Sequence, residues 1–372
     1  MDMAEQGKAP VREREYGIDL LKMLSMQMIV FLHVLGVGGV LANLPVLSGR
    51  YGLFWLVEGA CYCAVNCFAL ATGYLMCRGR FRYHRLFSLW LQVIFYTVGV
   101  TVFFSLWQPE LVTPIYWKAA FRPVVSKTYW YFTAYFAMYF FIPFFNRLLE
   151  VLNRKELQRL LLTGALLICL AYVVRDDLFR LHGGYTAVWL AYLYFAGAYF
   201  KKYPLEKPTP IRWLALYLLM VLVSWGGKMC GLLLQSRSEI CAVLGNNLYS
   251  YVSPTMLVAS VALFLAMTGL KIRSPMVQKL VSTCAPAAFS VYLIHCHPLI
   301  WHNVLTGRFA SAAFLPPVQA VALVLAGGLA IYWGGTLVDL VRIRIFKWLR
   351  IDKRIARVAG WCADRCRQDE KE

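Results

Sequence analysis

The chain has 372 residues, of which 60% are hydrophobic and 15% are charged, and its mean hydropathy is +0.57. Soluble globular chains are about 45–50% apolar and about 25% charged, so this composition excludes a soluble protein. The net charge of +19 does not indicate a nucleic-acid partner, because the basic residues occur in short clusters between apolar segments. We therefore expect an all-α, polytopic helical bundle that spans the membrane and contacts lipid.

The cysteines and the N-terminal region add two further expectations. The eleven cysteines are an odd number and lie mostly inside apolar segments, which does not fit a disulfide framework. Cys63 and Cys67 are one helical turn apart, but no second pair of metal ligands follows them, so we expect no metal cofactor. Residues 1–15 are polar and the first apolar run is too long for a signal peptide, so we expect that run to stay in the membrane.

Ten apolar segments are long enough to cross a bilayer. Their approximate limits are residues 17–41, 53–76, 86–107, 129–146, 157–174, 184–200, 211–233, 248–269, 284–303 and 317–340. Of the 38 lysines and arginines, 28 fall on one side of this arrangement and 9 on the other, with Lys22 inside the first segment. Because cytoplasmic loops are enriched in basic residues, this bias places both termini in the cytoplasm. We expect a transmembrane domain over residues 1–341 and a basic cytoplasmic tail over residues 342–372, lying on the anionic inner leaflet.

The first apolar segment carries polar residues on one helix face. Asp19 and Lys22 are one turn apart and are spaced to form an ion pair, while His33 returns to within about 20° of the same direction. At about 1.5 Å per residue, His33 lies roughly 16 Å farther along the axis than Lys22. A charge at membrane depth costs roughly 2.5–3.5 kcal/mol, so such residues usually face a protein interior or a wet cavity. Asp19 and Lys22 also fit a position at the membrane interface, whereas the depth of His33 favours a functional role.

The second apolar segment and the loop after it contain further candidates. Glu58 lies near the outer end of this segment and Asn66 lies at its centre. The following loop reads RGRFRYHR, in which Arg82 and Arg85 are one helical turn apart. Guanidinium groups at this spacing suit a phosphate group, because their planar forks pair bidentately with phosphate oxygens. The loop is equally consistent with topology alone, since any cytoplasmic loop tends to be basic.

Two later segments are rich in aromatic residues or histidines. Trp130 lies in an aromatic cluster at the beginning of the fourth segment. Such a cluster is typical of the aromatic belt at the membrane interface, and a platform for a substrate is the alternative. The ninth segment reads FSVYLIHCHPLIWHN, where His295 and His302 are seven residues apart, too far for one metal ion to bind both. The pair His297-Pro298 predicts a kink or a break in this helix.

Taken together, these motifs resemble the membrane-bound acyltransferase-3 family, which O-acetylates bacterial surface polysaccharides and related glycans. Lys22, followed after ten residues by His33, fits the family's basic-x10-histidine pattern, and Arg82-Tyr83-His84-Arg85 fits its arginine-x-x-arginine pattern. NCFALATGYL resembles its phenylalanine-rich stretch ending in serine-glycine-aromatic, with Thr72 in place of serine. TYWYFTAYFAMYFFIP and SVYLIH resemble its tryptophan–aromatic helix and its late tyrosine–histidine signature. The resemblance covers most of residues 14–340, and we expect neither the esterase-like partner domain nor the racemase domain found in some members.

The resemblance implies a bacterial plasma-membrane enzyme that moves an acetyl group from cytoplasmic acetyl-CoA to a hydroxyl of a cell-surface or lipid-linked glycan. Arg82 and Arg85 would bind the phosphates of CoA, and the pantetheine arm would run toward His33. His33 would then act as general base on the acceptor hydroxyl, since a neutral imidazole suits that work near pH 7. A homodimer is compatible with the sequence, which does not itself determine the assembly state.

The remaining candidate residues would support this chemistry. Asp19 and Lys22 would orient the first helix or neutralise one another. Tyr292 and His295 would donate to the developing oxyanion or bind the acceptor, and Glu58, Asn66 and Trp130 would contribute to acceptor binding.

Two other functions remain compatible with the sequence. A transporter of a small polar solute or glycan precursor would use the polar face of the first helix to line a translocation path. A sensory or scaffolding protein is disfavoured, because it needs no arginine pair beneath a buried histidine. Release of free CoA separates the enzyme from the transporter.

Overall fold

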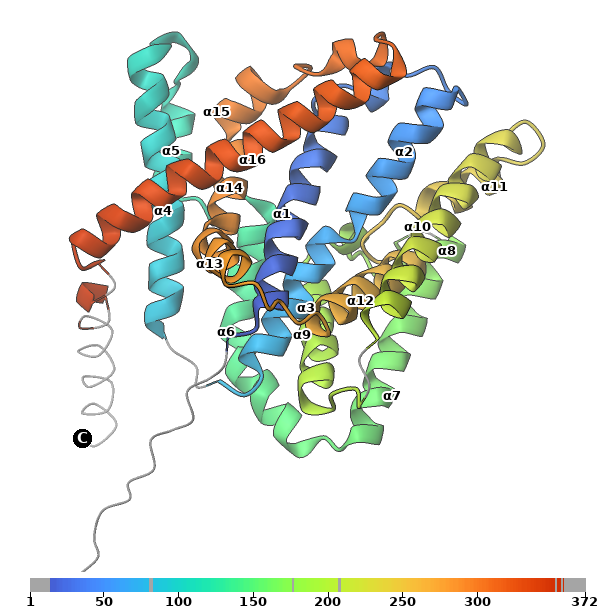
Figure 1. Ribbon diagram of the computed structural model, residues 1–372, viewed down its shortest axis with the longest axis horizontal. Helices are drawn as coiled ribbons and strands as arrows, with labels where there is room; N and C mark the ends of the chain where they lie inside the picture. Colours follow the sequence, from blue (N-terminus) through green and yellow to red (C-terminus); the bar gives the residue numbers. More distant parts are fainter. Residues whose placement is uncertain are drawn as a thin grey trace, which may run out of the picture.

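The computed structural model describes residues 14–79, 83–175, 177–206, 209–351, 353–355 and 357. Within these residues all regular secondary structure is helical, as the composition predicts (Figure 1). The helices are α1 (Tyr16–Leu35), α2 (Gly49–Tyr62), α3 (Ala64–Met76), α4 (Tyr83–Trp107), α5 (Pro114–Phe121), α6 (Trp130–Val151), α7 (Arg154–Gly164), α8 (Ala171–Arg175), α9 (Ala187–Lys202), α10 (Pro210–Leu233), α11 (Glu239–Asn247), α12 (Pro254–Thr268), α13 (Pro275–Cys284), α14 (Ala288–His295), α15 (Pro298–Ile300) and α16 (Pro317–Trp348).

Helix α1 is the centre of the bundle. It packs against α2, α3, α12, α13, α14 and α16, and these elements surround it in Figure 1. Leu21, Val30 and Leu35 of α1 are completely buried. The side-chain amide of Gln27 donates to the carbonyl oxygen of Gly328 in α16 at 3.2 Å. A polar side chain of α1 away from the Asp19–Lys22–His33 face thus also bonds to another helix, as polar groups at membrane depth require.

Seven segments of the described residues are long and apolar enough to cross a membrane. They are Tyr16–Leu35, Gly49–Met76, His84–Trp107, Arg154–Val173, Pro210–Leu233, Pro275–His295 and Pro317–Trp348. The other three segments predicted from the sequence contain α6, the 16-residue α9 and the 15-residue α12. The molecule is thus a multi-pass helical membrane protein, while the count of ten spans and the side on which the termini lie remain predictions.

The ninth predicted segment is broken at the position that the sequence indicates. Helix α14 ends at His295 and α15 begins at Pro298, because proline has no N–H to donate and its ring clashes with the preceding turn. The ring of His297 accepts a hydrogen bond from the backbone N–H of Leu299 at 3.3 Å and so caps the new helix. This break leaves His295 at the very end of α14, beside α1.

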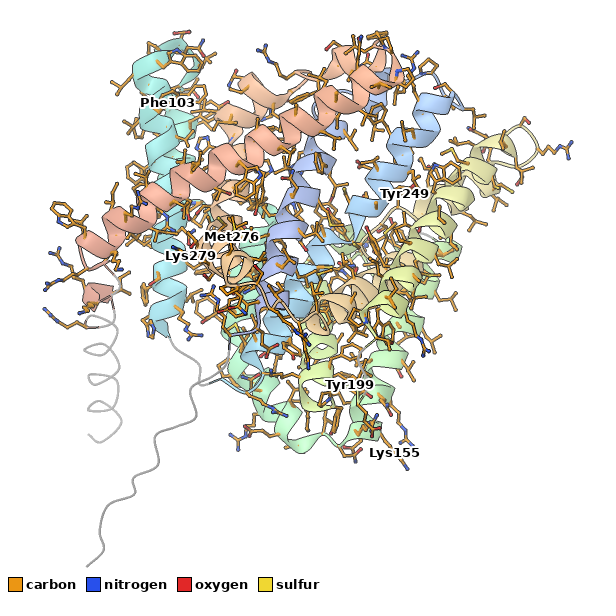
Figure 2. All side chains as sticks on the ribbon, viewed as in Figure 1. Phe103, Lys155, Tyr199, Tyr249, Met276 and Lys279 are labelled. Atoms are coloured by element: carbon orange, nitrogen blue, oxygen red, sulfur yellow. The ribbon has the colours of Figure 1, made fainter. Side chains whose placement is uncertain are left out.

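Several helix ends that the charge pattern assigns to the cytoplasm lie together at one end of the bundle. Lys201, near the end of α9, forms an ion pair with Glu15 before α1. Lys202 donates to the carbonyl oxygen of Leu152 after α6 at 2.7 Å. Helix α7, with Lys155 in its first turn, lies at this same end (Figure 2). The grouping agrees with the predicted alternation of loops.

The last helix extends past the predicted end of the transmembrane domain at residue 341. Helix α16 continues to Trp348, and Arg342 makes two bonds to the buried carboxylate of Asp339, at 2.5 and 3.1 Å. The hydroxyl of Tyr96 in α4 donates to the same carboxylate at 2.6 Å. Arg342, assigned by sequence to the tail, is therefore bonded to the helical bundle.

Candidate active site

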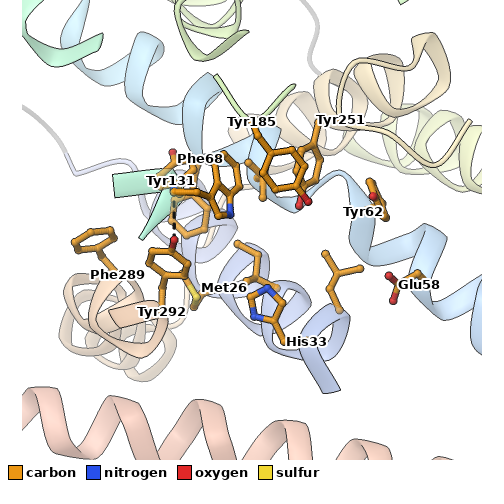
Figure 3. Close-up of a pocket in the computed structure, with 14 residues that line it drawn as sticks. Met26, His33, Glu58, Tyr62, Phe68, Tyr131, Tyr185, Tyr251, Phe289 and Tyr292 are labelled. Atoms are coloured by element: carbon orange, nitrogen blue, oxygen red, sulfur yellow. Dashed lines mark hydrogen bonds between the residues drawn. The ribbon is translucent and has the colours of Figure 1, made fainter. Parts of the chain in front are cut away.

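A cavity of about 140 Å³ lies beside α1 and contains four of the predicted site residues, namely His33, Glu58, Trp130 and Tyr292 (Figure 3). We call it the histidine cavity. Its wall is formed by Met26, Ile29, Leu32, His33, Glu58, Tyr62, Val65, Phe68, Trp130, Tyr131, Tyr185, Tyr251, Phe289 and Tyr292. Side chains from helices far apart in the sequence thus meet around His33, which extends from α1.

His33 is bonded to a second histidine that the sequence separates from it by 262 residues. Its Nδ1 lies 2.8 Å from Nε2 of His295, and Nδ1 of His295 lies 2.6 Å from the carbonyl oxygen of Val291, one turn earlier in α14. The sequence identified both histidines but not their contact, because no periodicity relates α1 to α14.

These bonds define the protonation of both rings in their neutral state. A carbonyl oxygen can only accept, so the Nδ1 of His295 carries the proton and its Nε2 has a lone pair. That lone pair can only accept, so Nδ1 of His33 donates to it. Nε2 of His33 is then unprotonated, and no described residue forms a hydrogen bond with it. The carbonyl of Val291 therefore leaves His33 with a basic nitrogen available.

Two other side chains contact the imidazole of His33. The ring of Trp301 packs edge-on against it, with centroids 4.8 Å apart and an interplanar angle of 79°. The thiol of Cys296 lies 3.5 Å from Nδ1. His295 lies behind His33 and is not part of the cavity wall, while His302 is exposed. The hydrogen-bonded histidine pair of the structure is thus His33 and His295. His302, which shares a helical spacing with His295 in the sequence, is not part of it.

Tyr292 presents a hydroxyl in the histidine cavity. Its oxygen accepts a hydrogen bond from the backbone N–H of Tyr131 at 3.3 Å (Figure 3). Because a hydroxyl both donates and accepts, this bond leaves the O–H of Tyr292 free to donate to a bound group. Burial of the ring among Tyr129, Tyr131 and Phe289 holds it in place.

The cavity wall beyond His33 is mostly aromatic. Trp130 lies 4.3 Å from the ring of Tyr185 and stacks against Tyr251 with centroids 6.0 Å apart, and Tyr62 lies 5.1 Å from Tyr251. Glu58 interrupts this wall (Figure 3). It is 8% exposed, and its Oε2 has no hydrogen-bond partner among the described residues. A buried carboxylate oxygen without a partner is costly, which indicates that a ligand or water completes its bonding.

The nearest buried cation is already engaged by other groups. Lys228 in α10 donates to the side-chain oxygen of Asn246 at 2.7 Å and lies 3.7 Å from the centre of the Trp55 ring. The described residues contain no salt bridge between Lys228 and Glu58. Lys228 is near enough to attract Glu58 electrostatically, but it does not occupy the unpartnered Oε2.

A second cavity, of about 540 Å³, lies at the beginning of α1, and we call it the charged cavity. Asp19 forms ion pairs with Arg14 at 2.8 Å and with Lys22 at 3.3 Å, which confirms the predicted Asp19–Lys22 pair. The wall is formed by Arg14, Glu15, Asp19, Lys22, Phe68, Thr72, Leu75, Met76, Arg85 and Tyr135. Arg82 lies outside the described residues, so only one member of the predicted arginine pair can be placed.

The two cavities share one side chain, that of Phe68 in α3. Its ring lies 6.3 Å from the ring of Tyr131, which lines the histidine cavity. Thr72, one turn later in α3, lines the charged cavity. Phe68 thus forms the wall between a chamber that contains a histidine and one that contains cations.

Asn66 does not line either cavity. It is completely buried in α3, donates to the carbonyl oxygen of Tyr251 at 2.8 Å and accepts from the indole N–H of Trp189 at 2.9 Å. These bonds hold the segment that carries Tyr251 against α3 and α9. A direct contact between Asn66 and a substrate remains a prediction without geometric support.

Sequence reasoning missed several residues of this site. Tyr185 and Tyr251 lie in connections between helices, where a tyrosine gives no signal of its own. Tyr62 lies four residues after Glu58 and therefore on the same helix face. This spacing was the one signal in the sequence that could have identified it.

The fold and the two cavities described above define a multi-pass helical membrane protein that holds polar groups between its helices. A family model described as an acyltransferase domain, that of acyltransferase family 3, matches residues 15–336. The chain belongs to this family and is an acyltransferase, as the resemblance of its motifs predicts. No curated protein and no solved structure showed a significant match to the chain.

Proposed function

We propose that this acyltransferase moves an acetyl group from acetyl-CoA to a hydroxyl of a cell-surface or lipid-linked glycan, in a bacterial plasma membrane. The observation that carries the proposal is the hydrogen-bonded pair His33–His295 beside a cavity that shares Phe68 with a charged cavity. A general base next to a chamber with cations for phosphate groups suits transfer from a CoA thioester to an alcohol.

Acetyl-CoA would bind from the charged cavity. Arg85, Arg14 and Lys22 offer cations to its phosphates, with Arg82 as the second member of the arginine pair. Asp19 holds Arg14 and Lys22 in position. The pantetheine arm then passes Phe68 and follows α1 for the roughly 16 Å between Lys22 and His33.

The chemistry follows from the free nitrogen of His33. Nε2 of His33 takes the proton of the acceptor hydroxyl as its oxygen attacks the acetyl carbonyl carbon. The lone pair of His295 stabilises the resulting imidazolium through Nδ1–H, and the hydroxyl of Tyr292 donates to the carbonyl oxygen as it becomes negative. When the intermediate collapses, the C–S bond breaks and the CoA sulfur takes the proton from Nε2 of His33.

The acceptor would occupy the aromatic part of the histidine cavity. The faces of Trp130, Tyr185 and Tyr251 suit the flat, apolar face of a sugar ring, and the unpartnered Oε2 of Glu58 accepts a bond from one of its hydroxyls. The aromatic faces and the one hydroxyl contact hold the ring so that a second hydroxyl faces His33.

The test is acetyl transfer by purified protein in detergent, with acetyl-CoA and a cell-envelope glycan extract, measured as free CoA and acetylated product. We expect His33→Ala to lose at least about a hundredfold in rate, the usual range for a general base. His302→Ala, at an exposed histidine outside both cavities, is the matched control and should keep the wild-type rate. An active His33→Ala variant would overturn the assignment of the base, and a wild-type protein that binds no acetyl-CoA would favour the transporter.

A further inference from the structure

Three potential metal ligands meet at one point of this site. Nδ1 of His33, Nε2 of His295 and Sγ of Cys296 all lie within 4.8 Å of one another. The first pair is 2.8 Å apart, and Sγ is 3.5 Å from Nδ1 of His33. Zinc takes nitrogen at about 2.0–2.1 Å and sulfur at about 2.3 Å in a tetrahedron, which separates two nitrogens by about 3.3 Å and nitrogen from sulfur by about 3.6 Å. The first two separations are close to these values, and the third, from Sγ to Nε2 of His295, is at most 4.8 Å and has to shorten when the ion binds.

His295 is already oriented as a metal ligand. Its Nδ1–H donates to the carbonyl of Val291, which is the outer contact that metal-bound histidines usually make, and its Nε2 lone pair points at the cluster. His33 supplies Nδ1 if its proton moves to Nε2, and Cys296 supplies a thiolate. His33 lines the histidine cavity, so a cation that enters this cavity reaches the ring of one of the three ligands.

We propose that His33, His295 and Cys296 form a binding site for a borderline-soft divalent cation such as Zn²⁺, and that the bound ion inhibits the enzyme. The metal takes the place of the proton between the two histidines, which moves to Nε2 of His33, and the thiol of Cys296 releases its proton to water. With the metal on Nδ1, the neutral ring of His33 carries its proton on Nε2, the nitrogen that accepts the hydroxyl proton in the proposed reaction. Zinc and catalysis therefore require opposite tautomers of the same ring. The inhibition, but not the binding, rests on the proposed function.

Binding is tested without turnover, by titrating Co²⁺ into tag-free protein in which Cys362→Ser and Cys366→Ser remove the tail thiols. We expect the visible absorption of tetrahedral cobalt and a thiolate-to-cobalt charge-transfer band, both displaced by Zn²⁺. Cys296→Ser should lose the charge-transfer band. Cys284→Ser, at a buried cysteine outside the cluster, should keep it. An unchanged spectrum in Cys296→Ser, or no tetrahedral spectrum in the parent protein, would overturn the site.

Inhibition is measured as acetylated product by mass spectrometry, because zinc also binds the thiol of released CoA. Each variant is compared with its own rate in the presence of a chelator. Zn²⁺ should inhibit the parent protein and Cys284→Ser equally and reversibly, whereas Cys296→Ser should need at least about tenfold more zinc. Full activity of the zinc-loaded parent would overturn the inhibitory role. If no acceptor supports turnover at all, the cobalt spectrum still decides whether the metal site exists, so the two proposals fail separately.

Discussion

A single backbone carbonyl determines which nitrogen of His33 can act as a base. Val291 accepts from Nδ1 of His295, and this bond fixes the direction of the next one, from Nδ1 of His33 to Nε2 of His295. The arrangement has the logic of a hydrolase triad, in which an outer group sets the tautomer of the base, although here a neutral imidazole takes the place of a carboxylate. His295 is accordingly a positioning residue, whose effect passes through His33.

Replacing His295 by phenylalanine keeps the ring but removes both hydrogen bonds. We expect kcat to fall by about 10- to 100-fold, because His33 loses its fixed tautomer and the stabilisation of its imidazolium. KM for acetyl-CoA should stay within about twofold of wild type, since His295 lines neither cavity. Steady-state kinetics separate the two constants. A loss confined to protein yield, with kcat unchanged, would show that the pair is only structural.

Arg85→Ala should raise KM for acetyl-CoA about tenfold or more with little change in kcat. A hydrogen bond to a charged group contributes about 1.5–3 kcal/mol, and each 1.4 kcal/mol corresponds to a factor of ten. Arg159→Ala is the matched control, because Arg159 is exposed, is assigned to the same side of the membrane and lines neither cavity. Equal KM values for Arg85→Ala and Arg159→Ala would show that Arg85 contributes to topology alone.

The packing of α3 on α9 explains the glycine of the Thr72-Gly73-Tyr74 motif. A Cβ on Gly73 would lie 2.0 Å from the carbonyl oxygen of Tyr194, and a Cβ on Gly197 would lie 2.0 Å from that of Leu70. Backbones can approach this closely only at small residues, as is usual between membrane helices. Since α3 carries Phe68 and Thr72, this contact also sets the positions of both cavity walls.

Gly73→Ala should therefore destabilise the bundle by about 1–3 kcal/mol, the usual cost of forcing an extra methyl group into a packed interface. Gly226→Ala is the control, because a Cβ on Gly226 meets no atom within 4 Å. Thermal unfolding in detergent should show a lower midpoint for Gly73→Ala only. Similar midpoints for both variants would contradict the packing account.

Local sequence patterns predicted where the helices lie better than they predicted the contacts between helices. The 3.6-residue period placed Asp19 and Lys22 within reach of each other, and the ion pair confirms it. The His297-Pro298 pair predicted a break, because the loss of a backbone N–H is a property of proline itself. The pairing of His33 with His295, by contrast, depends on how α14 packs against α1, which no local pattern encodes. Asn66 looked like a binding residue because a buried amide needs partners, and a sequence cannot say whether a ligand or the protein supplies them.

The arrangement of the whole molecule around Phe68 leads to another expected outcome. Phe68→Ala should open the wall between the cavities and admit water from the charged cavity to the thioester bound beside His33. Acetyl-CoA hydrolysis in the absence of acceptor should then rise at least about tenfold, because closure of an active site normally prevents such side reactions. Phe289→Ala removes an aromatic side chain from the histidine cavity alone and is the control. Equal rates of hydrolysis by the two variants would show that Phe68 does not separate the two cavities.

The same ring has a consequence for the membrane in which the protein lies. Cells store energy as a voltage and a proton gradient across their membranes, and about 2.3 kcal/mol is released when one elementary charge crosses 100 mV. A substrate path that runs from one face of the membrane toward the other could also conduct protons. The side chain of Phe68 separates the two halves of this path and so prevents a proton leak. Vesicles that contain Phe68→Ala should therefore lose an imposed proton gradient faster than vesicles that contain the wild-type protein or Phe289→Ala, as measured with an entrapped pH-sensitive dye.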